Sequence, residues 1–231
     1  MGTAALLRAA GVGVGDEVVV PAFGTVDVAD AVIQTGALPV FADIDPATYC
    51  LDASAVDAAI TPRTSAVVAV HRFGRTADLT RLHAIGRRHG LLVLEHAETE
   101  APFEETAQRR ERAAYLDARL RGVRTPDGGD GHTYQQYVVR VPGNGRPDRD
   151  AFARAIRAKG IDCRVPVKTP VHRLPGHRRW ISLPQTERAA EETLALPVDA
   201  SLTRRQMQRI VSACNALGGP ITIGSTAAFG V

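Results

Sequence analysis

The chain has 231 residues, of which 45% are hydrophobic and 23% are charged, so it can bury one large or two small cores. Its 28 basic and 25 acidic residues give a formal net charge of +3 and are spread along the whole length, which leaves no basic stripe for a nucleic acid. The sequence shows neither a secretory leader pattern nor an apolar run of about 18 residues. We therefore expect a cytoplasmic protein that does not contact a membrane.

The first hundred residues alternate short apolar runs with amphipathic segments, which is typical of an α/β layer. The apolar runs predict strands at 17–20, 38–41, 65–70 and 91–95. Helices are predicted between them at 26–36, 52–60 and 78–89, with Gly36 and Gly90 as stop signals. We assign residues 1–103 to a large α/β domain.

After residue 103 the pattern changes to a long charged helix at 104–120 and a turn rich in Pro and Gly at 126–131. The remainder predicts strands at 132–141 and 163–167 and helices at 149–159, 185–194 and 203–217. These elements form a smaller α+β domain over residues 104–219. Residues 220–231 carry Gly, Ser and Thr without a periodic pattern, so we expect a disordered tail there.

Several stretches along the chain resemble one family in the same order. In the first half these are 11–23 (GVGVGDEVVVPAF), 36–46 (GALPVFADIDP), 60–64 (ITPRT) and 71–79 (HRFGRTADL), and in the second half 132–141, 170–175 and 196–197. Together they resemble the DegT/DnrJ/EryC1/StrS family of sugar aminotransferases, which depend on pyridoxal phosphate (PLP). The resemblance implies a type I PLP-dependent aminotransferase-like fold with a reduced large domain, a nucleotide-sugar substrate, and a homodimer with composite active sites.

The same resemblance assigns roles to individual residues. Gly2, Thr3 and Ala4 correspond to the turn that holds the cofactor phosphate, where helix-start N–H groups face the anion. In the stretch 93–100 (VLEHAETE), His96 stands where the family has the Asp that pairs with the pyridine nitrogen, and Thr99 stands where it has a Gln. Two further residues complete the assignment: Thr25 at the position of the aromatic residue that stacks on the cofactor, and His172 in a loop that approaches the substrate in the partner's active site.

The family's Schiff-base lysine and its surrounding segment have no counterpart, because the sequence passes from Glu100 almost directly to the helix that starts at Glu104. The chain contains two lysines, Lys159 and Lys168, and neither matches the Schiff-base position. We therefore expect a degenerate homologue from an amino-sugar or antibiotic pathway that does not transaminate by itself. PLP is implied by the family, but a chain without a cofactor is the alternative.

Other interpretations of the same residues stay open. His96 with Glu95, and also His71, could serve as acid and base in a pocket vacated by the cofactor, or they could be a solvated relic. The chain could also be a non-catalytic partner of a full-length aminotransferase. No metal site is expected, since the three cysteines form no CxxC pair and no P-C-x-x-C follows His96.

Overall fold

Four parallel strands organise the first half of the chain in a computed structural model that describes residues 2–24, 26–97, 105–129, 131–141 and 148–218. They are β1 (Glu17–Pro21), β2 (Leu38–Ala42), β3 (Thr64–His71) and β4 (Leu92–Ala97), in the order β2-β1-β3-β4. β1 is buried along its whole length, as expected for a parallel strand covered on both faces. β4 at one edge is half-exposed.

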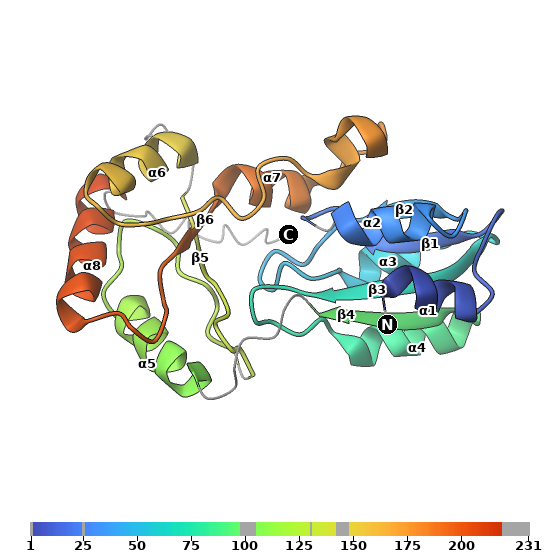
Figure 1. Cartoon of the computed structure of the whole chain (residues 1–231), viewed down its shortest axis with the longest axis horizontal. Helices are drawn as coiled ribbons and strands as arrows, with labels where there is room; N and C mark the ends of the chain where they lie inside the picture. Colours follow the sequence, from blue (N-terminus) through green and yellow to red (C-terminus); the bar gives the residue numbers. More distant parts are fainter. Residues whose placement is uncertain (1, 25, 98–104, 130, 142–147, 219–231) are drawn as a thin grey trace, which may run out of the picture.

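Helices cover both faces of this sheet (Figure 1). α1 (Thr3–Ala9) and α2 (Val26–Ile33) pack on one face through a buried cluster with Val18, Val20 and Val68 of the strands. α3 (Ala53–Ala59) and α4 (Leu79–His89) pack on the other face against Val19 and Val67. Asp52 and Asp78 cap the two helices by accepting backbone N–H bonds, and Gly90 ends α4 in the left-handed conformation at φ 68°.

The second half forms a separate lobe around a two-stranded antiparallel sheet, β5 (Tyr137–Arg140) and β6 (Thr193–Leu196) (Figure 1). Three of its helices, α5 (Thr106–Asp117), α6 (Arg149–Ala158) and α8 (Arg204–Gly218), contribute residues to one hydrophobic core that also includes Tyr137 and Leu194. No helix among the described residues is long and apolar enough to cross a membrane.

The chain between α6 and α7 (Pro184–Glu192) returns to the first lobe and joins the two halves (orange in Figure 1). It holds two short 3₁₀ turns, η2 (Val171–Arg173) and η3 (Pro175–His177). Val171 N donates to Ala22 O at 2.8 Å, and His177 Nε2 lies 2.9 Å from Asp30 Oδ1. Asp43 of the first lobe accepts bonds from the backbone N–H groups of Gln185 and Thr186, so it caps the start of α7 across the lobes.

Most predicted elements are confirmed, and three predictions were wrong. No strand forms at 163–167; the chain makes one isolated bridge there, between Arg164 and Ala195, because Pro166 interrupts the backbone donors. The predicted helix 185–194 ends at Glu192, since Thr193–Leu196 pairs with β5 instead. The predicted strand 132–141 shortens to Tyr137–Arg140, because Tyr134 adopts φ 48°. The predicted lobe boundary and tail lie outside the described residues.

Candidate functional site

The carboxyl edge of the parallel sheet is the candidate site. The chain leaves β1 through α2 toward β2 and leaves β3 through α4 toward β4, so the connections diverge between β1 and β3. Ligands of open α/β sheets bind in the crevice at such a point, outside the carboxyl ends of the strands. Three residues predicted from the sequence lie at these strand ends: His71, Glu95 and His96.

His96 lies on the face of the sheet that carries α1 and α2, since Leu92 and Leu94 of the same strand pack into the cluster formed by those helices. Its Nδ1 is 3.0 Å from Thr3 Oγ1, at the first residue of α1. Its Nε2 is 3.4 Å from Asp27 Oδ2, in the first turn of α2. Thus His96 connects the starts of two helices to the end of β4.

His71 and Glu95 lie on the opposite face of the sheet from His96. Their side chains form a pair, with His71 Nε2 3.2 Å from Glu95 Oε2. The backbone N–H of Ala77 donates to His71 Nδ1 at 3.1 Å, so that nitrogen carries no proton and Nε2–H faces the carboxylate. Because both nitrogens are engaged, His71 acts as a hydrogen-bonding residue in this arrangement. The structure therefore separates the three residues predicted for acid and base chemistry into two sites.

The remaining predicted residues are distributed as follows. Gly2 precedes α1 in an extended conformation and supplies no side-chain cap, and Ala4 lies in the first turn of that helix. His172 is fully buried in η2, with Nε2 3.1 Å from Glu187 Oε1, so its own chain covers it. Thr25 and Thr99 lie outside the described residues.

The residues that would hold PLP do not fit it in this arrangement. The phosphate and the ring nitrogen of PLP occupy different positions around one ring, so the groups that bind them must be separated by that ring. Here Thr3, from the predicted phosphate turn, is hydrogen-bonded directly to His96, at the predicted pyridine position. The second nitrogen of His96 faces Asp27. An anion beside the pyridine nitrogen, which the chemistry needs, is replaced by this imidazole.

Among the described residues, neither lysine has a hydrogen bond or ion pair with His96. Lys159 caps the carboxyl end of α6 in the second lobe. Lys168 is exposed and follows Val167, whose side chain packs against Phe23 and Phe73 at the end of the first-lobe strands. Of the two lysines, Lys168 is therefore the one beside a segment that packs against the first lobe.

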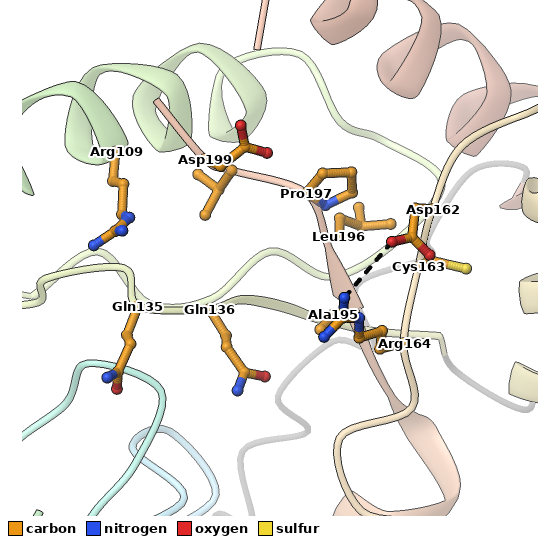
Figure 2. Close-up of a pocket in the computed structure, with 11 residues that line it drawn as sticks. Arg109, Gln135, Gln136, Asp162, Cys163, Arg164, Ala195, Leu196, Pro197 and Asp199 are labelled. Atoms are coloured by element: carbon orange, nitrogen blue, oxygen red, sulfur yellow. Dashed lines mark ion pairs between the residues drawn. The ribbon is translucent and has the colours of Figure 1, made fainter. Parts of the chain in front are cut away.

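A hollow of about 410 Å³ lies in the second lobe (Figure 2). It is formed by the start of α5, the chain before β5, the chain after α6, and the chain around β6. Its side chains include Arg109, Gln135, Gln136, Asp162, Arg164 and Asp199. Asp162 and Arg164 face each other at 3.9 Å on its rim. No sequence pattern predicts this hollow, because its residues come from four separate segments.

The described parts of the chain contain possible metal ligands and three cysteines. Among the described residues no three His, Cys, Asp or Glu side chains gather as metal ligands would. Cys50, Cys163 and Cys214 are buried, as the sequence predicts, and unpaired with one another. Burial raises the pKa of the Cys50 thiol to about 11 and that of Cys214 to about 12, so both stay protonated at neutral pH.

Comparison with known proteins identifies the family. The sequence profile of the DegT/DnrJ/EryC1/StrS aminotransferase family matches residues 1–101 and 102–215, which is nearly the whole chain. The chain belongs to this family. The resemblance found in the sequence is thereby confirmed.

Individual relatives include an aminotransferase, a synthase and a regulatory protein. An L-glutamine:2-deoxy-scyllo-inosose aminotransferase of Streptomyces kanamyceticus is 54% identical over 97 residues, which cover 41% of this chain and 23% of that enzyme. The GDP-perosamine synthase of Caulobacter vibrioides is 33% identical, with 84% and 52% covered. A pleiotropic regulatory protein of Geobacillus stearothermophilus is 28% identical, with 89% and 79% covered. The match to the first of these spans about a quarter of that enzyme's length.

The family match is divided in two, and the alignment with one relative contains many positions without a counterpart in this chain. The two profile matches meet between Ala101 and Pro102, four residues after β4 ends. The alignment with the Geobacillus protein runs over 300 positions, whereas 89% of 231 residues is about 206 residues. Roughly ninety aligned positions therefore have no counterpart in this chain.

Solved structures share the fold. DesV of S. venezuelae, in complex with a ketimine intermediate, superposes with a TM-score of 0.83 at 22% identity, covering 95% of this chain and 83% of that one. NtdA of Bacillus subtilis, solved with bound PMP, gives 0.82 at 18% identity, covering 93% and 70%. These likenesses confirm the expected type I PLP-dependent aminotransferase-like fold.

Proposed function

We propose that this chain keeps the scaffold of a sugar aminotransferase from amino-sugar or antibiotic biosynthesis but does not transaminate by itself. The observation that carries the proposal is that the two family matches meet between residues 101 and 102, in the region where the resemblance places the Schiff-base lysine. Transamination through PLP needs a lysine amine that forms a covalent bond to the cofactor. Lys159 and Lys168 both follow the break and lie in the second-lobe half of the sequence.

The geometry at the sheet edge supports the same proposal. The direct hydrogen bond between Thr3 and His96 occupies the space that a cofactor ring would need between them. His96 is an imidazole, and a cationic imidazole cannot stabilise a pyridinium by charge as a carboxylate does. A chain with this arrangement lacks both the covalent anchor and the electron-sink partner of its relatives.

The proposal also includes a protein partner, which is either a second copy of this chain or a full-length aminotransferase. The family implies a homodimer, and pairing with a full-length aminotransferase would place this chain beside an intact active site. A small molecule of the nucleotide-sugar class is the ligand that the family implies. The half-exposed apolar residues of the edge strand β4, Leu92, Val93 and Leu94, support self-association.

A turnover assay tests the proposal. The purified chain is mixed with PLP, an amino donor and a panel of keto-sugar nucleotides and scyllo-inososes, and amine formation is followed by mass spectrometry. We expect no product above a heat-denatured blank, while a full-length relative such as the Streptomyces kanamyceticus enzyme serves as the positive control. Turnover by the chain alone at an enzyme-like rate, about 1 s⁻¹ or faster, would show the proposal to be wrong.

A catalytic alternative is favoured by one specific observation. The sheet edge still holds a histidine in contact with a carboxylate and a hydroxyl, which is a set of groups that general acid and base catalysis uses. This alternative retains His96 from the predicted acid and base residues. Glu95 and His71 drop out of it because they lie on the other face and bond each other.

A further inference from the structure

Thr3, His96 and Asp27 come from three different elements and meet at the carboxyl edge of the sheet. His96 lies between the other two, 3.0 Å from the Thr3 hydroxyl and 3.4 Å from the Asp27 carboxylate. The His96 side chain is 23% exposed and that of Asp27 is 71% exposed, so the group is accessible to a small molecule. A nucleophile beside a base that is oriented by a third group is the geometric signature of an activated nucleophile.

The partners of His96 determine which nitrogen carries the proton. Asp27 favours the tautomer with its hydrogen on Nε2, because an ionised carboxylate only accepts hydrogen bonds and this one lies 3.4 Å from that nitrogen. In the neutral ring, Nδ1 is then unprotonated and accepts the hydroxyl hydrogen of Thr3. This is the protonation state in which a histidine removes a proton from a hydroxyl group.

We propose that Thr3, His96 and Asp27 form a nucleophile, base and orienting carboxylate that accept an acyl group from a small carboxylic ester. The Thr3 Oγ1 lone pair forms a bond to the ester carbonyl carbon, and the hydroxyl proton moves to His96 Nδ1. The carbon–oxygen bond to the alcohol breaks, and the alcohol leaves with that proton. Water attacks the resulting threonyl ester by the same route, which releases the acid and restores the hydroxyl.

The surroundings of His96 favour a small, neutral, partly apolar substrate. Leu92 and Leu94 lie on the same face of β4 as His96 and are only half-buried, so they offer apolar surface to a short acyl chain. The position outside the ends of parallel strands is where this class of fold binds ligands. A neutral ester therefore suits the site, because its carbonyl carbon can react with the Thr3 hydroxyl and its acyl chain can contact Leu92 and Leu94.

The test uses p-nitrophenyl acetate as the probe and the whole chain without PLP, so its result is independent of the proposed lack of transamination. Release of p-nitrophenolate is followed by absorbance, and intact mass with peptide mapping locates the acetyl group. We expect one acetyl group on Thr3 of the wild-type protein. His96→Gln should slow acetylation of Thr3 by about 100-fold or more, in the range that loss of a general base produces.

Four further variants sharpen the test. Thr3→Val should remove the adduct and Thr3→Ser should retain it, because only the serine variant keeps a hydroxyl. Asp27→Asn should slow acetylation by only about threefold, since an exposed carboxylate is screened by water. His89→Gln is the matched control: His89 also lies 3.1 Å from an aspartate, Asp57, but on the far face of the sheet, and this variant should react like the wild type.

Two results would overturn the proposal. The first is a wild-type protein that carries no acetyl group on Thr3 after prolonged exposure, while exposed histidines and lysines are modified. The second is acetylation of Thr3 that proceeds at the wild-type rate in His96→Gln. Circular dichroism and thermal unfolding of each variant establish that a lost adduct does not reflect a lost fold, and the Ser variant keeps the test decisive if the Val variant fails to fold.

Discussion

At the residue scale, His132 shows how burial changes a protonation equilibrium. Its ring is buried and stacks on Tyr134 with centroids 3.9 Å apart, and its Nδ1 lies 3.1 Å from both Gly74 O and Tyr134 N. Burial, together with the nearby positive charge of Arg75, lowers the pKa of His132 from 6.5 to about 4. The folded protein therefore keeps this ring neutral.

This depressed pKa predicts a pH-dependent stability. Between pH 6.5 and pH 4 the unfolded chain binds a proton on His132 and the folded chain does not, so folding stability is lost as the pH falls. We expect His132 to contribute at most about 3 kcal/mol to this loss. Urea unfolding over this range should show a weaker pH dependence for His132→Asn than for the wild type. His83→Asn, at an exposed position of α4, should leave the dependence unchanged.

The residue scale also shows what the sequence could predict of the site. The stretch 93–100 pointed to His96 and Glu95 at a strand end, and the structure places both there. Grouping Glu95 with His96 overlooked that successive residues of a strand face opposite sides, so that Glu95 pairs with His71 while His96 pairs with Thr3. Asp27 was missed because it is 69 positions away and only the path of α2 brings it to His96.

At the scale of elements, periodicity found most helices and strands because their local preferences agree with their tertiary surroundings. The four strands of the first lobe are continuous apolar runs between clear stop signals, so they were predictable. β6 was not, since Thr193–Leu196 continues a helical pattern and becomes a strand only through pairing with β5. Tertiary context overrides propensity at such a place.

The edge strand β4 leads to a prediction about assembly. Its burial is the lowest of the four strands, and its apolar residues Leu92, Val93 and Leu94 are half-exposed. An open edge with apolar side chains tends to pair with another chain. Multi-angle light scattering should therefore show a dimer or larger assembly at micromolar concentration. A monodisperse monomer across that concentration range would contradict the expected self-association.

At the scale of the whole molecule, the two lobes are held together by contacts that no local pattern reveals. Asp43 at the end of the first-lobe strand β2 caps α7 of the second half through Gln185 and Thr186. The buried η2 turn, which contains His172, packs against Phe41 of the same sheet. The elements on either side of residues 101 and 102, where the two family matches meet, thus have hydrophobic cores of their own.

The central claim, that this family member has lost the covalent chemistry of its relatives, is tested most directly by trapping an aldimine. The purified chain is titrated with PLP, its visible absorbance is recorded, borohydride is added, and the intact mass and the modified peptide are determined. We predict no aldimine band and no stoichiometric adduct on Lys159 or Lys168. A single borohydride-fixed PLP on Lys168, absent from Lys168→Arg and retained in Lys159→Arg, would contradict the account.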